Sequence, residues 1–451
     1  MCGSRAEPPP FFFQTFSGTS FIDTIEFQGF CPTLFPAGAG MSSARVRGGR
    51  TGMFLSLLVT AVGLNLSGLA MTAFAQDKPA PTKPATRIPQ ATSALFDGQS
   101  LDGWTVEGDC RVVVEEGLLV LKEGNGWVRS DLTYRDFALH VEWKAVKTAD
   151  YDSGVYVRTL AGGAPFPSNS HQVNLLDGSE GNVKNIKPTI GTKGPVKRGE
   201  WNSFDITCMG SKLKLAINGQ PVYDVDGLKN REGYIGLQCE VMKGGEFQFR
   251  NLRITELGYQ SLFNGKDLAG WEGGGAPAES CWLVKEGLLV CNGHKGPWLK
   301  TLAEYGDFDF RFEYQVSPGG NSGVYVRVPA DGNHHRENAT LPPAGFEVQV
   351  LDDSAPQYAQ LKDYQYCGSV YDICGAQPRV CRPVGHWNTM SIRCEKQHVT
   401  VTHNGVVVAD ITDQSHPLID LRKTRGFLGL QNHDTQVQFR HLRLAELGGE
   451  R

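Results

Sequence analysis

Two stretches of this chain contain the same ordered series of short segments, and this internal repeat is the feature that most restricts the fold. The matching pairs, in chain order, are LFDGQSLDGW (95–104) with LFNGKDLAGW (262–271), SGVYVR (153–158) with its copy at 322–327, EWNSFDITC (200–208) with HWNTMSIRC (386–394), and FRNLRITEL (249–257) with FRHLRLAEL (439–447). Such a series indicates two homologous domains. We place them at 93–257 and 260–447.

Each copy consists of short segments in which apolar and polar residues alternate, which is the period of a β-strand. Asn218-Gly219 and Asn404-Gly405 each separate two such segments, and Asn-Gly is typical of a tight β-hairpin turn. No amphipathic helix longer than about three turns is evident. We therefore predict an all-β fold, with two sandwiches of jelly-roll type in tandem.

The charge of the chain argues against one class of partner. Its 44 lysines and arginines are outnumbered by 48 acidic residues, which gives a formal net charge of -4. A protein that binds a phosphate backbone usually carries an excess of basic residues. We therefore do not expect a nucleic acid as partner.

The N-terminal part has the features of an exported protein. Residues 41–75 contain three arginines, an apolar stretch and the small-x-small sequence AFA at the end, as a cleaved secretory signal does. A retained membrane anchor is the competing interpretation. Residues 1–40 have no periodicity, which favours a translation start at Met41, and 76–92 form a Pro/Ala-rich linker. We expect a periplasmic or extracellular protein with no stable membrane insertion after signal cleavage.

Eleven cysteines in an exported chain raise the question of disulfides. Cys281 and Cys291 flank the hairpin-like segment CWLVKEGLLVC, where a cross-strand disulfide could close. Cys367, Cys374 and Cys381 recur at seven-residue intervals. Because the run contains no C-x-x-C pair, we favour loop disulfides or buried thiols over a zinc site.

The two copies differ at the polar positions of one segment. GFEVQVLDD in the second copy aligns with SHQVNLLDG in the first, which sets Glu347 against Gln172 and Gln349 against Asn174. By the period of a strand Glu347 and Gln349 share one face, and a β-bulge before Asp352 would turn that carboxylate to the same face. Paired carboxylates in the groove of a curved sandwich suit work on a glycosidic bond.

Histidine and arginine accompany these acids. Nine of the eleven histidines fall in the second copy, where GLQNH ends at His433 and the first copy has Glu240. Arg158 and Arg327 recur in the SGVYVR segments, where alternation places each on the same face as the tyrosine two residues before it. Either a structural ion pair or a ligand clamp would explain an arginine there.

The second copy resembles a known family, the 3-keto-disaccharide hydrolase domain, also called domain of unknown function 1080. The segments that carry the resemblance are, in order, LFNGKDLAGW, NSGVYVRV, GFEVQVLDD, GSVYD, GHWNTMSI, NGVVV, GFLGLQNH and VQFRHLRL. They cover nearly all of 260–447. The resemblance implies a concanavalin A-like lectin/glucanase fold for both copies, and a carbohydrate as substrate.

The resemblance also implies an activity, the cleavage of glycosides whose sugar is oxidised at carbon 3, by a glycosidase-type hydrolase or lyase. The ketone acidifies the C2 proton, a base removes it, and an enolate forms before the C1 substituent departs and water adds. Glu347 or His433 would then be the base. Arg327 or a bound divalent cation would stabilise the enolate, and Asp352 or Tyr371 would assist the leaving oxygen.

Further residues are expected to contact the sugar: Asn321, Gln349 and Gln431 in the second copy, and Arg158, Gln172 and Asn174 in the first. The first copy departs from the family at Gln172, Glu240 and Asp152, which favours binding over turnover there. The alternative for the whole chain is a non-catalytic carbohydrate-binding or surface-interaction protein, because this fold serves lectins as readily as enzymes.

Overall fold

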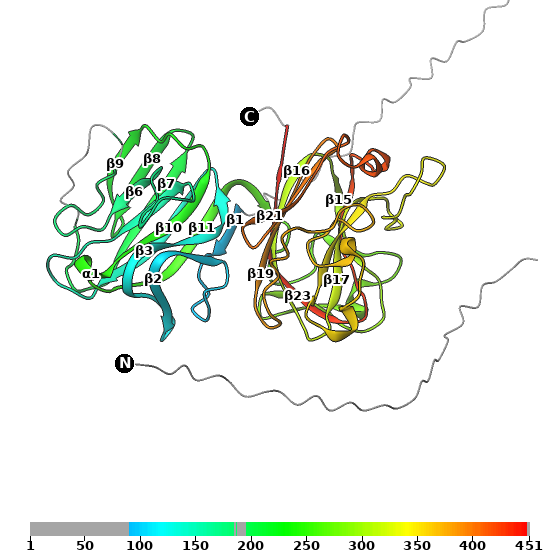
Figure 1. Cartoon of the computed structure of the whole chain (residues 1–451), viewed down its shortest axis with the longest axis horizontal. Helices are drawn as coiled ribbons and strands as arrows, with labels where there is room; N and C mark the ends of the chain where they lie inside the picture. Colours follow the sequence, from blue (N-terminus) through cyan, green and yellow to red (C-terminus); the bar gives the residue numbers. More distant parts are fainter. Residues whose placement is uncertain (1–89, 185, 187–194, 449–451) are drawn as a thin grey trace, which may run out of the picture. The chain divides into compact units, whose positions relative to one another are not determined.

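A computed structural model describes residues 90–184, 186 and 195–448 (Figure 1). The upstream segment predicted at 1–40, the signal sequence predicted at 41–75 and most of the predicted linker lie outside these residues. In the part of the chain that the structure describes, no helix is both long enough and apolar enough to cross a membrane.

Strands make up almost all of the first copy. In chain order they are β1 (Gln90–Ala94), β2 (Trp104–Glu115), β3 (Leu118–Tyr134), β4 (Phe137–Ala145), β5 (Gly154–Thr159), β6 (His171–Asn174), β7 (Asn202–Met209), β8 (Lys212–Ile217), β9 (Gln220–Asp226), β10 (Gly233–Glu240) and β11 (Phe247–Ser261). One short helix, α1 (Val241–Gly244), precedes β11. Because β1 begins at Gln90, the first strand takes in the end of the stretch that we predicted as a linker.

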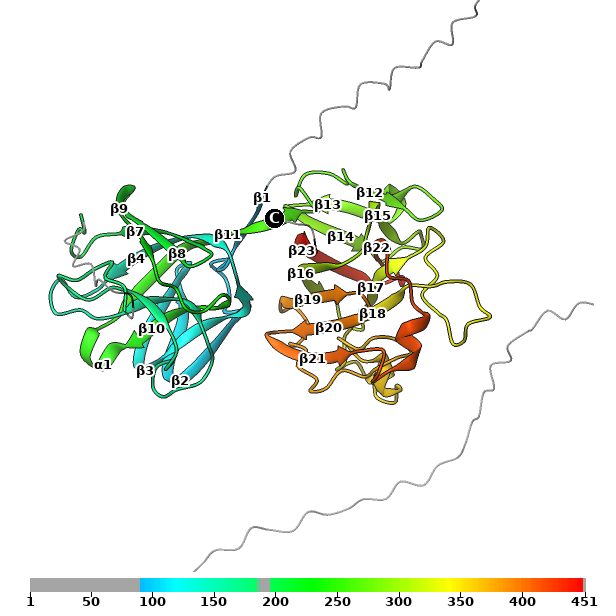
Figure 2. The ribbon, with the colours of Figure 1, turned by 90° about the horizontal axis from the view of Figure 1, so that it is seen from above.

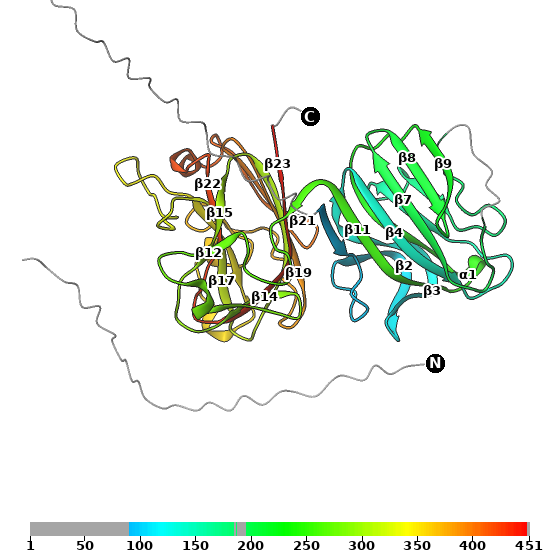
Figure 3. The ribbon, with the colours of Figure 1, turned by 180° about the vertical axis from the view of Figure 1, so that it is seen from behind.

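Two antiparallel layers enclose the core of the first copy. One layer runs β9, β8, β7, β4, β11, and the other runs β6, β5, β10, β3, β2. Figure 3 shows β4, β7, β8 and β9 side by side. Along β4 buried and half-buried residues alternate, and Phe137, Val141 and Trp143 are at most 1% exposed. The alternation in the sequence therefore reports which face of a strand packs into the core.

The second copy repeats this arrangement. Its strands are β12 (Trp271–Gly273), β13 (Trp282–Lys285), β14 (Leu288–Asn292), β15 (Leu299–Tyr305), β16 (Phe308–Val316), β17 (Asn321–Val328), β18 (Phe346–Leu351), β19 (Asn388–Glu395), β20 (His398–His403), β21 (Val406–Ile411), β22 (Gly426–Leu430) and β23 (Gln436–Glu446). Short 3-10 helices occur at η1 (Ala278–Ser280), η2 (Pro356–Tyr358), η3 (Asp363–Gln365) and η4 (Pro417–Leu421).

The two layers of the second copy contain different numbers of strands. A five-stranded sheet has the order β12-β15-β22-β17-β18, and Figure 2 shows β22, β17 and β18 side by side. The other layer runs β13, β14, β23, β16, β19, β20, β21. Phe310, Val324, Val348 and Ile392, from both layers, belong to one core cluster and are fully buried. These sheets confirm the predicted all-β fold, with two concanavalin A-like jelly-roll sandwiches.

The Asn-Gly turns form as predicted. Asn218 and Asn404 have φ angles of 49° and 46°, and the glycines that follow them have φ angles of 76° and 79°. Positive φ at both central positions is the type I′ turn, whose twist matches that of the flanking strands. The two turns join β8 to β9 and β20 to β21.

Every cysteine in the described residues is a free thiol. The predicted hairpin at CWLVKEGLLVC is confirmed, because β13 pairs with β14. The disulfide across it is not formed, since Sγ of Cys281 lies 3.4 Å from the Pro297 carbonyl oxygen and Sγ of Cys291 lies 3.2 Å from Oδ1 of Asn432. Of the two alternatives that we favoured, loop disulfides and buried thiols, the structure shows thiols.

Candidate active site

A pocket of about 260 Å³ lies on the five-stranded sheet of the second copy. It is lined by Asn321, His334, His335, Glu347, Gln349, Leu351, Tyr358, Leu361, Gln365, Tyr371, Gln431 and His433. Of the site residues predicted for this copy, all but Arg327 and Asp352 are among them. The pocket therefore collects most of the polar side chains that distinguish the second copy.

Strands β17 and β18 form the base of the pocket. Tyr325 pairs with Glu347 and Gly323 pairs with Gln349, with no shift of register along the two strands. Because β18 is regular, Glu347, Gln349 and Leu351 project to one face, as alternation predicts. Gly323 leaves room for this side chain, since a Cβ at this position would collide with Oε1 of Glu347.

A loop segment covers the outer edge of β18. The backbone N–H of Gln349 donates to the carbonyl of Ser369, and its carbonyl accepts from the N–H of Gly368, both at 2.9 Å. The N–H of Tyr371 donates to the carbonyl of Glu347, also at 2.9 Å. These three bonds place Tyr371 next to Glu347.

The carboxyl group of Glu347 is nearly sealed from solvent, with 2% of the residue exposed. Its Oε2 lies 3.2 Å from Nε2 of His334, while Oε1 is buried without a hydrogen-bond partner. Burial raises the pKa of Glu347 to about 8, and the negative charge of Asp372 adds to this effect. A carboxyl group with such a pKa exchanges protons near neutral pH, as a general acid or base must.

His334 presents a lone pair to this carboxyl group. Its Nδ1 lies 3.1 Å from the carbonyl oxygen of Gly332, which can only accept, so Nδ1 carries the hydrogen. The ring stacks on Tyr325 with 4.7 Å between centroids. Burial lowers the pKa of His334 to about 4. Near neutral pH the Glu347 and His334 pair therefore holds one proton, on the carboxyl side.

A row of rings continues from His334. The ring of His335 lies 4.1 Å from that of His334, and its Nδ1 lies 2.5 Å from Oδ2 of Asp372. The other neighbour of His335 is Tyr371, whose ring meets it edge to face at 5.7 Å. Nε2 of Gln365 donates to the hydroxyl oxygen of Tyr371 at 2.9 Å, which leaves the hydroxyl hydrogen of Tyr371 available for another acceptor.

Two glutamines complete the polar lining. Nε2 of Gln431 donates to the hydroxyl of Tyr325 at 3.2 Å, and its Oε1 is buried without a partner. Nε2 of Gln349 donates to Oδ1 of Asn321 at 3.0 Å. A buried oxygen without a donor costs about 1–3 kcal/mol. The unpaired oxygens of Gln431 and Glu347 therefore mark positions where a hydroxylated ligand would supply the missing hydrogens.

The prediction that Arg327 shares the pocket face with Tyr325 is wrong. Arg327 has a φ of 53°, and the pairing of β17 with β22 shifts register between Tyr325 and Val328. This bulge turns the side chain away from the pocket. Its Nε donates to the Gly306 carbonyl at 2.8 Å and its Nη2 lies 3.1 Å from Oδ1 of Asp307. The structural ion pair is the correct alternative.

The predicted placement of Asp352 is also wrong. β18 ends at Leu351 without the bulge that we expected, so alternation places Asp352 opposite Glu347. Its Oδ2 accepts from the backbone N–H of Gly319 at 2.8 Å, and its Oδ1 accepts from Oγ of Ser354 at 2.6 Å. This carboxylate holds the turn after the strand.

Of the residues predicted for sugar binding in the first copy, Arg158 has side-chain partners within that copy. Arg158 repeats the arrangement of Arg327, with a φ of 48°, a 2.8 Å contact to Asp136 and a 2.5 Å hydrogen bond to the Gly210 carbonyl. Asn174 is half-buried at the end of β6, where its carbonyl accepts from the backbone N–H of Gly181 at 2.8 Å. The guanidinium groups of Arg158 and Arg327 are thus both held by protein partners, and neither arginine is a ligand clamp.

The first copy has an amide chain where the second has an acid. Gln172, at the position of Glu347, donates through Nε2 to Oε1 of Gln238. Nε2 of Gln238 donates in turn to Oε2 of Glu240 at 2.8 Å. The β5–β6 connection is also shorter than the β17–β18 connection that carries His334. The amides of the first copy thus satisfy one another, without an acid–imidazole pair at this position.

Sequence reasoning missed His334, His335 and Asp372. The two histidines lie in a connection with no strand period, and their contact with the strand depends on how that connection closes. A usable signal was present: adjacent histidines occur in a stretch that lengthens the second copy relative to the first. Asp372 follows Tyr371, which was predicted.

A family model described as a 3-keto-alpha-glucoside-1,2-lyase-like domain matches the chain twice, over residues 91–255 and 258–445. A protein of Bacteroides thetaiotaomicron described as a 3-keto-disaccharide hydrolase is 28% identical, over 46% of this chain and 84% of its own length.

Similar solved structures include two from Parabacteroides distasonis, each described as a possible glycosyl hydrolase. One is 22% identical over 42% of this chain and 94% of its own, with a TM-score of 0.36. The other is 27% identical over 42% of this chain and 99% of its own, with a TM-score of 0.34. A carbohydrate-binding module of Bacillus subtilis is 15% identical over 34% of this chain and 96% of its own, with a TM-score of 0.28.

Proposed function

Because this chain belongs to the 3-keto-alpha-glucoside-1,2-lyase-like domain family, as the resemblance in its sequence predicted, we propose that its second copy cleaves 3-keto-glycosides. The observation that carries the proposal is the Glu347 carboxyl, buried in a pocket, with one oxygen unpaired and the other 3.2 Å from His334. The pocket of about 260 Å³ is slightly smaller than most ligand sites, which span roughly 300–1,000 Å³. It suits one or two sugar rings.

The reaction begins at C2 of the oxidised sugar. The ketone at C3 acidifies the C2 proton, and Oε1 of Glu347 removes it. Glu347 does so in its ionised form, so the carboxyl group must first lose its own proton. Nε2 of His334, whose Nδ1–H is held by Gly332, lies 3.2 Å from the other carboxyl oxygen.

The electron pair left at C2 becomes an enolate with its charge on the C3 oxygen. It then re-forms the ketone as the bond from C1 to the leaving oxygen breaks, which leaves a C1–C2 double bond. We assign the enolate charge to His335, which is held by Asp372, and the proton for the leaving oxygen to the Tyr371 hydroxyl. Water then adds its oxygen to C1 and a proton to C2. The products are a 3-keto sugar and the released alcohol.

Three further predictions belong to this proposal. His433 lines the pocket and is the second candidate for the base, and a divalent cation is the second candidate for the enolate. An assay with and without a chelator tests the cation. Export of the protein follows from the signal predicted at 41–75, and sequencing the N-terminus of the secreted chain tests it.

The first copy has a different part in this proposal. Its Gln172 cannot act as a base, and the amide chain through Gln238 ends on Glu240. We assign it sugar binding without turnover, which would raise the local concentration of substrate near the second copy. Deletion of 93–257 should then raise KM and leave kcat unchanged.

Turnover in heavy water tests the proposal. The purified chain is incubated with a 3-keto-disaccharide and, in parallel, with the unoxidised disaccharide. We expect cleavage of the oxidised sugar alone, with deuterium at C2 of the product, because C2 is protonated from solvent in the last step. Product incubated without the protein is the control for spontaneous exchange. Cleavage of both sugars, or cleavage with the C2 hydrogen retained, contradicts the mechanism, and binding without products favours a carbohydrate-binding protein.

A further inference from the structure

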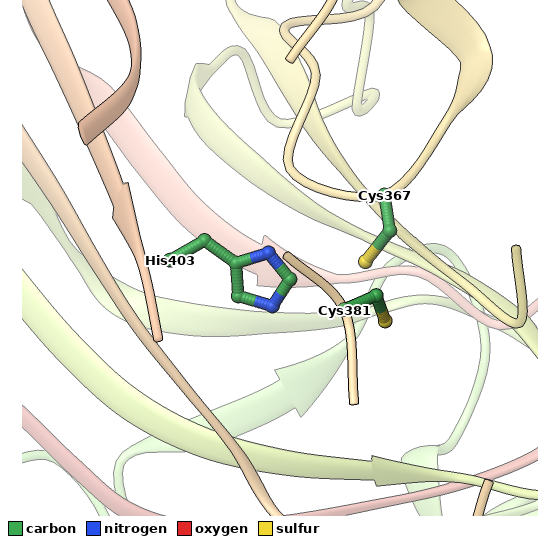
Figure 4. Close-up of side chains that lie close together, drawn as sticks. All are labelled: Cys367, Cys381 and His403. Atoms are coloured by element: carbon green, nitrogen blue, oxygen red, sulfur yellow. The ribbon is translucent and has the colours of Figure 1, made fainter. Parts of the chain in front are cut away.

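A buried cluster of soft donor atoms lies outside the pocket. Cys367, Cys381 and His403 place one ligand atom each within 4.8 Å of one another (Figure 4). Cys367 is 1% exposed, His403 is fully buried, and Cys381 is partly buried. Figure 4 shows the imidazole of His403 pointing from its strand toward the two sulfur atoms.

The polar atoms of this cluster are incompletely satisfied. Nδ1 of His403 is buried without a hydrogen-bond partner, while its Nε2 lies 2.8 Å from the hydroxyl of Tyr314. The same hydroxyl lies 2.9 Å from Sγ of Cys367 and 3.8 Å from Sγ of Cys381. A neutral imidazole carries a lone pair on one ring nitrogen, as a metal ligand must.

We propose that Cys367, Cys381 and His403 bind a structural zinc ion, with the oxygen of Tyr314 as the fourth donor. Zinc in structural sites prefers a tetrahedron of thiolate and imidazole donors, at about 2.3 Å for sulfur and about 2.0–2.1 Å for nitrogen. Donors at those radii lie roughly 3.3–3.8 Å apart, so the side chains need only small movements to close on an ion. Soft sulfur donors favour zinc over magnesium or calcium.

The position of the cluster gives the ion a role. Cys367 and Cys381 belong to the segment between β18 and β19, which also supplies Tyr371 to the pocket. His403 ends β20, in the other layer of the sandwich. The residue after Cys367, Gly368, bonds to the backbone of β18. Zinc would therefore tie the wall of the pocket to the opposite layer, and this inference does not depend on the reaction proposed above.

Metal content tests the proposal. The reduced full-length chain is equilibrated with zinc, freed of loose metal by gel filtration and measured by mass spectrometry. We expect about one zinc per chain, lost in Cys381→Ser and His403→Gln. Cys374→Ser is the matched control, because this cysteine belongs to the same seven-residue series but lies outside the cluster. Zinc retained in both ligand variants, or absent from the wild type, overturns the proposal.

A measurement on the wild type covers the case in which the variants fail to fold. X-ray absorption of the zinc-loaded chain should show two sulfur neighbours, and a shell without sulfur overturns the proposal. Thiol titration in denaturant, with and without reductant, detects a disulfide, which is the competing state of these cysteines. Two thiols missing without reductant, together with no bound zinc after reduction, would mean that Cys367 and Cys381 form a disulfide instead.

Discussion

Oε2 of Glu347 and Nε2 of His334 lie 3.2 Å apart in the pocket, where the acid is buried and the imidazole is partly buried. Burial raises the pKa of the acid to about 8 and lowers the pKa of the imidazole to about 4. Between these values the pair carries one proton and no net charge, so it avoids the cost of a buried ion. The pair therefore predicts how activity and stability depend on pH.

The first consequence concerns the pH dependence of activity. If Glu347 is the base, kcat/KM should rise as the carboxyl group ionises, with an apparent pKa near 8. The measurement is release of alcohol from a 3-keto-glycoside over about pH 6 to about pH 9, corrected for alkaline decay of the substrate. A fall of kcat/KM over this range would instead make Glu347 a general acid.

Stability should depend on pH through the same pair. Between about pH 4.5 and about pH 6.5 the folded pair and the unfolded chain each hold one proton, so the two shifts cancel. Above that window the unfolded chain holds none, while folded Glu347 keeps its proton up to about pH 8. The free energy of unfolding should therefore fall by about 2 kcal/mol between pH 6.5 and pH 8.

Urea unfolding of wild type and Glu347→Gln over this pH range measures the effect. The glutamine cannot ionise, so the variant should lack the part of the slope that belongs to position 347. Equal slopes in the two proteins would mean that Glu347 titrates normally.

Gly323→Ala should inactivate the pocket by steric displacement. The added Cβ would collide with Oε1 of Glu347 and push the carboxyl group out of place. We expect a loss of kcat of at least about tenfold, since misplacing a catalytic group by about 1 Å can cost 10²-fold. Gly154→Ala is the matched control, because its Cβ would collide with the amide of Gln172 in the first copy. Equal losses of kcat in the two variants would contradict the assignment of activity to the second copy.

Arg327→Lys should act on stability and not on chemistry. The guanidinium is fully buried and contacts Gly306 and Asp307, and an ammonium group cannot reproduce both contacts. We expect a loss of about 2 kcal/mol in the free energy of unfolding, with kcat within about threefold of wild type. Arg158→Lys should lower stability in the same way. Loss of kcat at unchanged stability would mean that Arg327 takes part in the reaction after all.

The sequence predicts the parts of this protein that obey a fixed period. The repeat predicts two sandwiches, and alternation alone places Glu347 and Gln349 on one face, because β18 pairs with β17 without a shift. The Asn-Gly turns are equally local, since their φ angles depend on two residues. The resemblance to a family adds Tyr371 and Gln431 to the site, and the comparison of the two copies adds His433.

The failures arise where the period breaks. Arg327 lies at a bulge with positive φ, and no glycine marks that position, so alternation places its side chain on the wrong face. Asp352 fails for the opposite reason, because the expected bulge is absent. The contact of His334 with Glu347 depends on how a loop closes. The proximity of His403 to Cys367 depends on how the end of β20 packs against the segment between β18 and β19. Neither contact leaves a pattern of spacing in the sequence.

The central claim is that Glu347 moves the C2 proton, and turnover of Glu347→Gln tests it most directly. The amide keeps the shape of the side chain but cannot take up a proton, so kcat on a 3-keto-glucoside should fall by roughly 10²–10⁴-fold while substrate binding persists. Gln172→Ala, at the same position of the first copy, should leave kcat unchanged. A kcat of Glu347→Gln within a few-fold of wild type would contradict the account.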